Sequence, residues 1–192
     1  MHRYFKIYKP YGVLSQFISN SKHQRRKRFL GDLHDFPEGS MAIGRLDEKS
    51  EGLLLITTDG KLNAHITGSK VEKEYYALVD GAIDDDAIEA MRNGVEIGFE
   101  GKKYNTKPCK VERLTEAPKL PERSKKIRDA RHGPVTWITI TLKEGKFRQV
   151  RKMTSAVGYP TLRLVRVRIG NFTLDQMDTG DVIELNANDV LI

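Results

Sequence analysis

The sequence has little of several features that would define its class at once. It contains one cysteine, Cys109, among 192 residues, so no internal disulfide can form. With only one cysteine and five scattered histidines, a cysteine-based zinc site is excluded as well, and we expect no metal. No apolar run approaches the ~18 residues that a membrane-spanning helix needs, and the N-terminus shows no signal-peptide pattern. We therefore expect a cytoplasmic protein with no membrane association.

Positive charge is the first feature that the chain has in excess. Lysine and arginine total 33 against 26 aspartates and glutamates, which gives a net charge of +7. Such a bias is typical of proteins that bind a polyanion, so nucleic acid is the expected partner, and a basic enzyme with solvated charges is the alternative. Two segments are rich in these residues. We interpret residues 22–28 as a mobile basic arm and residues 119–131 as part of a second flexible basic loop.

Hydrophobic periodicity predicts a mixture of strands and helices over a single domain, residues 1–192, with two subdomains flanking a cleft as a variant of this organisation. Strand patterns occupy residues 4–9, 53–56, 73–79, 136–142, 162–169 and 181–185. Helices are predicted after Asp59, after the acidic run 84–86, and over residues 147–157. Because these elements do not alternate in a strict strand-helix-strand rhythm, we expect an α+β fold with flanking helices on a mixed, largely antiparallel sheet.

The segment from Lys143 to Arg168 carries eight lysines and arginines and one acid, Glu144. In its predicted helix, Phe147, Val150, Met153 and Val157 have the spacing of an apolar face, and Gly158 follows as a C-cap. Arg148 and Arg151 lie one turn apart, with Lys152 beside them, which predicts a cationic stripe. In the following strand, alternation points Arg163, Arg166 and Arg168 outward. A solvated amphipathic helix is the alternative interpretation.

A charged loop, residues 44–52, leads directly into the buried strand 53–56. A carboxylate at the mouth of a strand can be held rigidly, which makes Asp47 a candidate catalytic group. Charge alone leaves two other interpretations open, since Asp47 could be a turn residue or the ion-pair partner of Arg45.

Four stretches together resemble the RsuA-type ribosomal RNA pseudouridine synthases. They are Lys9-Pro10-Tyr11-Gly12-Val13, then Gly44-Arg45-Leu46-Asp47 with Ser50-Glu51-Gly52-Leu53-Leu54-Leu55-Ile56-Thr57-Thr58-Asp59-Gly60, then Lys73-Glu74-Tyr75, and finally 144–153 with 164–170. They follow in the family's order and span most of residues 4–185. Family members with an S4 RNA-binding domain place it before the first stretch. Since that stretch begins within ten residues of Met1, we expect no S4 domain.

The resemblance implies the pseudouridine synthase fold with an RNA-binding cleft, and an isomerase that converts uridine to pseudouridine without a cofactor. The forms without an S4 domain that the chain is similar to act on 23S rRNA, so we expect 23S rRNA or its assembly intermediate as the partner of a monomeric enzyme. Small-subunit rRNA and tRNA are alternative substrates. A non-catalytic RNA-binding protein of ribosome assembly is the rival from another class.

The resemblance also assigns roles to individual residues. Asp47 is the catalytic carboxylate, Arg151 its salt-bridge partner, and Tyr75 the ring that stacks on the target base. Strand alternation then predicts that the neighbouring Tyr76 faces the core. The implied substrate-binding residues are Arg45, Arg148, Gln149, Lys152 and Arg166. The two basic segments would contact phosphates without reading bases.

Overall fold

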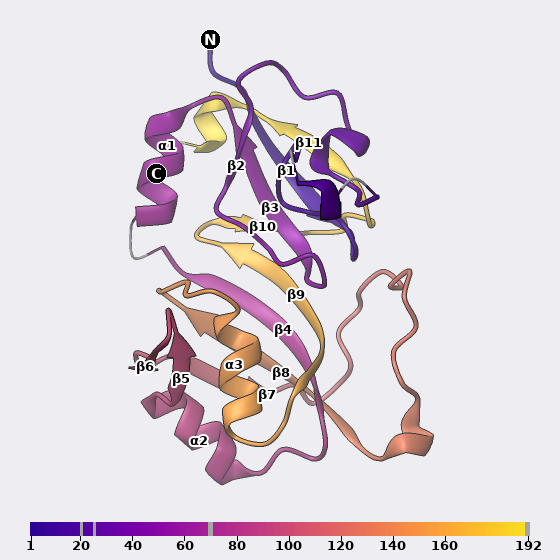
Figure 1. Ribbon diagram of the computed structural model, residues 1–192, viewed down its shortest axis with the longest axis vertical. Coiled ribbons are helices and arrows are strands. Elements are labelled where there is room, and N and C mark those ends of the chain that lie inside the picture. Colours follow the sequence, from indigo (N-terminus) through magenta and orange to yellow (C-terminus); the bar gives the residue numbers. More distant parts are fainter. Residues whose placement is uncertain (20, 25, 69–70, 191–192) are drawn as a thin grey trace. The chain divides into compact units, whose positions relative to one another are not determined.

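The computed structural model describes residues 1–19, 21–24, 26–68 and 71–190. These residues form two compact units, each assembled from separate stretches of the chain. Unit 1 contains residues 1–71, 121–124 and 171–192, and unit 2 contains residues 72–120 and 125–170. The two units are described in turn, with the elements labelled as in Figure 1.

Unit 1 is built on strands from both ends of the sequence. Its elements are β1 (Tyr4–Lys9), η1 (Lys22–Gln24), η2 (Leu30–Asp32), β2 (Met41–Ile43), β3 (Glu51–Thr57), α1 (Gly60–Gly68), β10 (Phe172–Thr173), β11 (Val182–Leu185) and η4 (Ala187–Val190). β1 pairs antiparallel with both β11 and β3, and β2 pairs antiparallel with β3. All seven residues of β3 are buried, which explains why this strand has a continuous apolar run instead of alternation.

Unit 2 combines α-helices with its own set of strands. Its elements are β4 (Lys73–Asp80), α2 (Asp85–Asn93), β5 (Glu96–Phe99), β6 (Lys102–Asn105), β7 (Lys110–Arg113), η3 (Ala130–His132), β8 (Val135–Leu142), α3 (Gln149–Ala156) and β9 (Thr161–Ile169). β4 pairs antiparallel with β9 and with β8, and β8 also pairs with β7. β5 and β6 form a separate hairpin. The α+β class and the largely antiparallel pairing are therefore confirmed.

The helix ends follow local capping chemistry. The Asp59 carboxylate accepts hydrogen bonds from the backbone N–H groups of Lys61 (2.9 Å) and Leu62 (3.3 Å), and Asp84 accepts from Ala87 N (2.8 Å). Gly94 ends α2 with φ +105°, where an added Cβ would lie 2.2 Å from the carbonyl oxygen of Thr106. A side chain at position 94 would therefore force the following hairpin away from α2.

Two details of the predicted pattern are wrong. Phe147 lies outside α3, which begins at Gln149, and its side chain is exposed rather than packed on an apolar face. Arg163 and Arg166 are buried rather than outward. Alternation cannot place both side chains outward, because residues three positions apart point to opposite faces of a strand, and all four residues 163–166 of β9 are buried.

Candidate active site

Asp47 lies in unit 1 on the loop of residues 44–50, between β2 and β3. The loop closes on itself through a hydrogen bond from Ser50 N to the carbonyl oxygen of Asp47 (3.0 Å). The side chain of Asp47 is partly exposed and that of Arg45 is exposed. The structure thus brings these two predicted site residues together on one short, turned segment.

The residue before Asp47 is held by a serine from a distant part of the sequence. The Ser15 hydroxyl accepts a hydrogen bond from Leu46 N (2.9 Å) and donates one to the carbonyl oxygen of Leu46 (2.7 Å). The Leu46 side chain is buried. These contacts fix the backbone on the N-terminal side of Asp47, which is the kind of support that a positioned carboxylate requires.

The residue after Asp47 is held by the first motif of the chain. Gly12 N donates to the carbonyl oxygen of Glu48 (2.8 Å). Lys9 is 0% exposed, and its ammonium donates to the carbonyl oxygens of Pro10 (2.9 Å), Val13 (2.7 Å) and Glu48 (3.5 Å). A buried ammonium is stable only with such oxygen partners. The sequence analysis assigned no role to Lys9, although its position in the first family motif could have indicated one.

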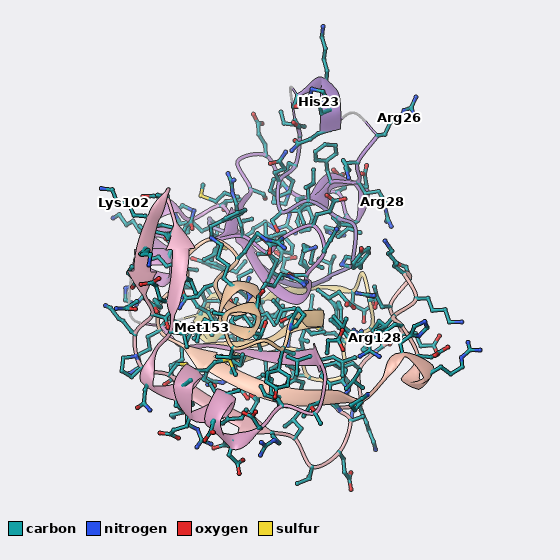
Figure 2. All side chains as sticks on the ribbon, turned by 60° about the horizontal axis from the view of Figure 1, so that its bottom comes forward. His23, Arg26, Arg28, Lys102, Arg128 and Met153 are labelled. Carbon is teal, nitrogen blue, oxygen red and sulfur yellow. The ribbon has the colours of Figure 1, made fainter. Side chains whose placement is uncertain are left out.

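The basic arm reaches the same loop through an ion pair. Lys27 Nζ lies 2.7 Å from Glu48 Oε1, and Arg28 forms a parallel bridge with Val13. The arm predicted to be mobile is thus anchored at its C-terminal end. His23, Arg26 and Arg28 are exposed, and Figure 2 shows the Arg26 side chain pointing away from the ribbon. Arg25 lies outside the described residues.

Tyr75 and Arg166 lie together in unit 2. Tyr75 is paired with Arg166 on β9 and with Ile140 on β8, and it is 9% exposed. Tyr76 is more exposed than Tyr75, the reverse of the expected order. Lys73 shares a face of β4 with Tyr75, and burial, together with the nearby charge of Arg166, lowers the pKa of its ammonium. Lys73 is therefore a site candidate that sequence reasoning missed, although it begins the third motif.

Gln149 is almost fully buried at the start of α3. It is 3% exposed, its Oε1 accepts from Lys146 N (2.9 Å), and its Nε2 donates to Glu144 Oε1 (2.6 Å). Lys152, also a predicted substrate-binding residue, donates to the carbonyl oxygen of Gly98 (2.7 Å). Both side chains therefore hold the local backbone, which indicates that they position the surrounding segment.

The two predicted arginines of this segment differ in their backbone setting. Arg148 is exposed and takes the left-handed conformation, φ 54° and ψ 32°, at the N-cap of α3. Arg151 lies within α3 and is partly exposed, and its Nη1 donates to the carbonyl oxygen of Thr161 (3.4 Å). This bond directs Arg151 toward the first residue of β9.

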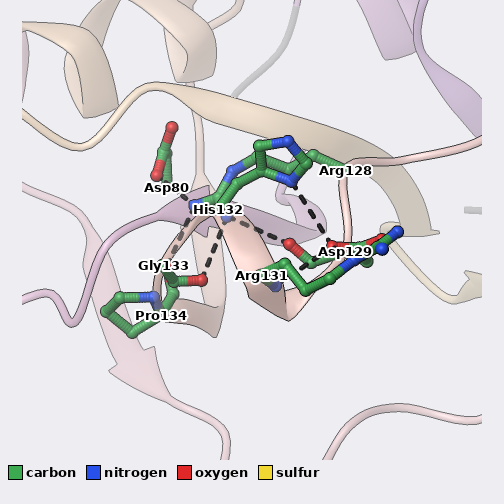
Figure 3. Close-up of polar contacts among 7 residues, drawn as sticks. All are labelled: Asp80, Arg128, Asp129, Arg131, His132, Gly133 and Pro134. Carbon is green, nitrogen blue, oxygen red and sulfur yellow. Dashed lines mark hydrogen bonds and ion pairs between the residues drawn. The ribbon is translucent and has the colours of Figure 1, made fainter.

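The second basic loop contains arginines that bind the protein itself, as Figure 3 shows. Arg128 pairs with Asp80 and donates to the carbonyl oxygens of Gly133 (3.0 Å) and Pro134 (3.0 Å). Arg131 pairs with Asp129 (2.6 Å). At least Arg128 and Arg131 of this loop therefore bind acids or carbonyl oxygens of unit 2.

Two kinds of feature are absent from the described part of the chain. No group of three or more histidine, cysteine, aspartate or glutamate residues there is placed to hold a metal ion. No helix within that part is long and apolar enough to span a membrane.

Comparison with known proteins defines the class. The family model described as "RNA pseudouridylate synthase" matches residues 3–156. A crystal structure titled "Crystal structure of pseudouridylate synthase" superposes with a TM-score of 0.77 at 25% identity, over 99% of this chain and 73% of that one. The chain belongs to the RNA pseudouridylate synthase family, and it is an isomerase that converts uridine in RNA to pseudouridine.

Two curated relatives have names that are more specific than the family description. The chain is 44% identical over 171 residues to "Ribosomal large subunit pseudouridine synthase E" of Xanthomonas axonopodis pv. citri, covering 88% of this chain and 86% of that protein. It is 41% identical over 179 residues to the protein of the same name from Vibrio parahaemolyticus, covering 92% and 71%. The family resemblance stated from the sequence motifs is confirmed. The rival interpretation as a non-catalytic RNA-binding protein is not supported.

Proposed function

We propose that this protein isomerises a specific uridine of 23S rRNA to pseudouridine, with Asp47 as the catalytic carboxylate. The assignment of Asp47 rests on the loop that contains the family's catalytic motif. The backbone of this loop is hydrogen-bonded on both sides of Asp47. Ser15 fixes Leu46 on one side of Asp47, and Lys9 and Gly12 hold Glu48 on the other. The relatives named for the large ribosomal subunit support the choice of RNA.

The reaction explains why one positioned carboxylate is enough for the enzyme to act. The glycosidic bond between N1 and C1′ breaks, the uracil turns, and C5 forms the new bond to C1′. C5 then loses its proton and N1 takes one up, so that no atom is gained or lost overall. A carboxylate near C1′ can assist in two ways, either by attacking C1′ or by removing the 2′ proton. Neither route changes the oxidation state of the nucleoside, so the proposal includes no cofactor.

Arg151 is the proposed salt-bridge partner of Asp47. The two residues belong to different units, and their pairing stays a prediction that rests on the family resemblance. A guanidinium can bind a carboxylate through two hydrogen bonds, which fixes its orientation as well as its charge. Tyr75 is the proposed stacking partner of the target base, with Arg166 beside it on β9.

The remaining predicted substrate-binding residues divide into two groups. Arg45 and Arg148 are exposed, as phosphate contacts would be. Gln149 and Lys152, which bind neighbouring groups of unit 2, are proposed to act by shaping the segment that carries Arg148 and Arg151. The protein is proposed to act as a monomer on rRNA or on an assembly intermediate.

The test replaces Asp47 by asparagine, which preserves size and removes the charge. Asp47→Asn should fold and bind RNA, but should lose at least about a thousandfold in pseudouridine formation, since the reacting group itself is removed. Product is measured on unmodified 23S rRNA by carbodiimide treatment and primer extension. Asp35→Asn, the same chemical change at an exposed site of unit 1, is the matched control.

Three outcomes would count against the proposal. Product formed by Asp47→Asn at the rate of the control would remove Asp47 from catalysis. Activity on 16S rRNA or tRNA in place of 23S rRNA would overturn the substrate. A dimer in sedimentation at working concentration would contradict the monomer.

A further inference from the structure

The sequence pattern places Phe147 on the buried face of a helix, but in the structure Phe147 precedes α3 and is exposed. It lies two residues before α3 and is 66% exposed. We propose that Phe147 is a stacking platform for an unpaired nucleobase of the RNA substrate, separate from the target base assigned to Tyr75. The proposal rests on the proposed function and deepens it, because it adds a second nucleotide to the binding site.

A single exposed aromatic residue is common on protein surfaces and needs no explanation by itself. Phe147 differs because a fixed turn presents it. Gln149 closes the turn by donating its N–H to the carbonyl oxygen of Lys146 (3.0 Å) while its side chain accepts from Lys146 N (2.9 Å). The ring is therefore held outside the helix by the backbone on both sides.

The turn also contains backbone strain and a rigid anchor. Arg148, directly after Phe147, has φ 54°, a left-handed conformation that disfavours a side chain with a Cβ. Such strain persists only where the surroundings enforce it, and it is concentrated at ligand sites. Glu144 anchors the residue that follows Arg148, because its carboxylate accepts hydrogen bonds from Gln149 Nε2 as well as from Tyr104 OH and Lys107 N.

The charges around the ring select the chemistry of the ligand. Lys152 Nζ lies 5.3 Å from the centre of the Phe147 ring, and Lys146 Nζ lies 4.8 Å from the Phe99 ring and 5.0 Å from the Tyr104 ring. Between Lys143 and Arg168 the sole acid is Glu144, and its carboxylate accepts hydrogen bonds from Tyr104 and Gln149 within the protein.

An exposed apolar ring with one lysine ammonium against it, in a segment rich in cations, fits a nucleotide, since the base can stack on the ring and the phosphate can meet an ammonium group. An apolar protein surface would not use the cations. An acidic protein surface would not use the ring. Single-stranded RNA uses both, whereas the bases of a duplex are covered by their neighbours.

The first experiment places a fluorescent reporter at the site. Phe147→Trp is compared with Ile183→Trp, an exposed position on β11 of unit 1, and Trp137 provides the same background in both. The probe is a single-stranded RNA of about ten adenines and cytosines without uridine, with a blunt duplex of similar length as the comparison. The single strand at saturation should quench Phe147→Trp strongly and Ile183→Trp weakly, and the duplex should quench neither much.

The second experiment measures affinity. Phe147→Ala should weaken binding of the single strand by about 5- to 150-fold, the range for the loss of one stacked base. The slope of log affinity against log salt should not change, because no charge is removed. Phe147→Tyr should bind the single strand about as tightly as the wild type. Phe147→Leu, which is apolar but has no ring, should bind as weakly as Phe147→Ala.

The outcomes separate this proposal from the proposed function. Equal quenching at positions 147 and 183, equal quenching by the duplex, or full affinity in Phe147→Leu would overturn the stacking platform, even if wild-type protein forms pseudouridine. Conversely, activity in Asp47→Asn would overturn the catalytic assignment and leave the uridine-free binding result intact.

Discussion

The two basic segments look alike in the sequence but use their cations differently. In the arm, Lys22, His23, Arg26 and Arg28 have exposed side chains. In the loop of residues 119–131, Arg128 and Arg131 bind acids and carbonyl oxygens of unit 2, and Arg123 lies over the Tyr11 ring at 4.7 Å. A count of charges therefore indicates that a protein favours polyanions, and the structure is needed to show which cations bind acids and carbonyl oxygens of the protein itself.

The largest expected effect on RNA binding comes from the arm. Replacing Lys22, Arg26 and Arg28 together by serine should lower the slope of log affinity against log salt by about 2 to 3, because each phosphate that a cation neutralises adds about 0.7–0.9 to that slope. Filter binding of 23S rRNA over a series of salt concentrations measures this slope.

Two single variants sharpen the comparison. Arg26→Ser should lower the slope by about 0.7–0.9, while Arg131→Ser, the matched arginine of the loop, should leave it nearly unchanged. Equal effects of these two variants would show that the ion pair of Arg131 does not keep it from RNA.

The next effect concerns stability rather than RNA. Arg128 has a side chain that is 17% exposed and joins Asp80 to the carbonyl oxygens of Gly133 and Pro134. Arg128→Ala should therefore lower the free energy of unfolding by about 1–3 kcal/mol, measured by urea denaturation. RNA affinity of the folded variant should stay near that of the wild type, and a large loss of affinity without a loss of stability would reverse the distinction drawn between the two segments.

The smallest effect is a local titration. The hydrogen bond from the Arg131 side chain is the main cause that lowers the pKa of the Asp129 carboxyl from its ordinary value. The lowered pKa stabilises the fold above the ordinary pKa, and this contribution disappears as the pH falls through the lowered value. Carbon NMR of Asp129 should show the pKa rising toward its ordinary value in Arg131→Ser, and an unchanged pKa would mean that the ion pair does not form in solution.

Much of the fold could be predicted because its signals are local. The continuous apolar run of β3, the caps Asp59 and Asp84, and Gly158 after α3 each act within a few residues. Phe147 was misplaced because helical spacing includes any apolar residue of the right period. The left-handed residue Arg148, which separates Phe147 from the helix, has no signal in that pattern.

The site was less predictable, since its supports come from distant parts of the chain. Ser15 holds Leu46 across 31 residues, and Arg128 reaches Asp80 across 48. Neither distance leaves a periodic trace in the sequence. Asp47 itself was found through a family motif, because charge and spacing alone allow a turn residue equally well.

The pairing of β1 with β11 has a consequence for synthesis of the protein. Tyr4 lies opposite Leu185, so the outer strand β11 of unit 1 is translated only after the whole of unit 2. The strands of unit 2, by contrast, all lie within residues 73–169 and are complete earlier. A ribosome making this enzyme therefore releases β1 well before its β11 partner, and β1 must wait for that partner until every strand of unit 2 has been translated.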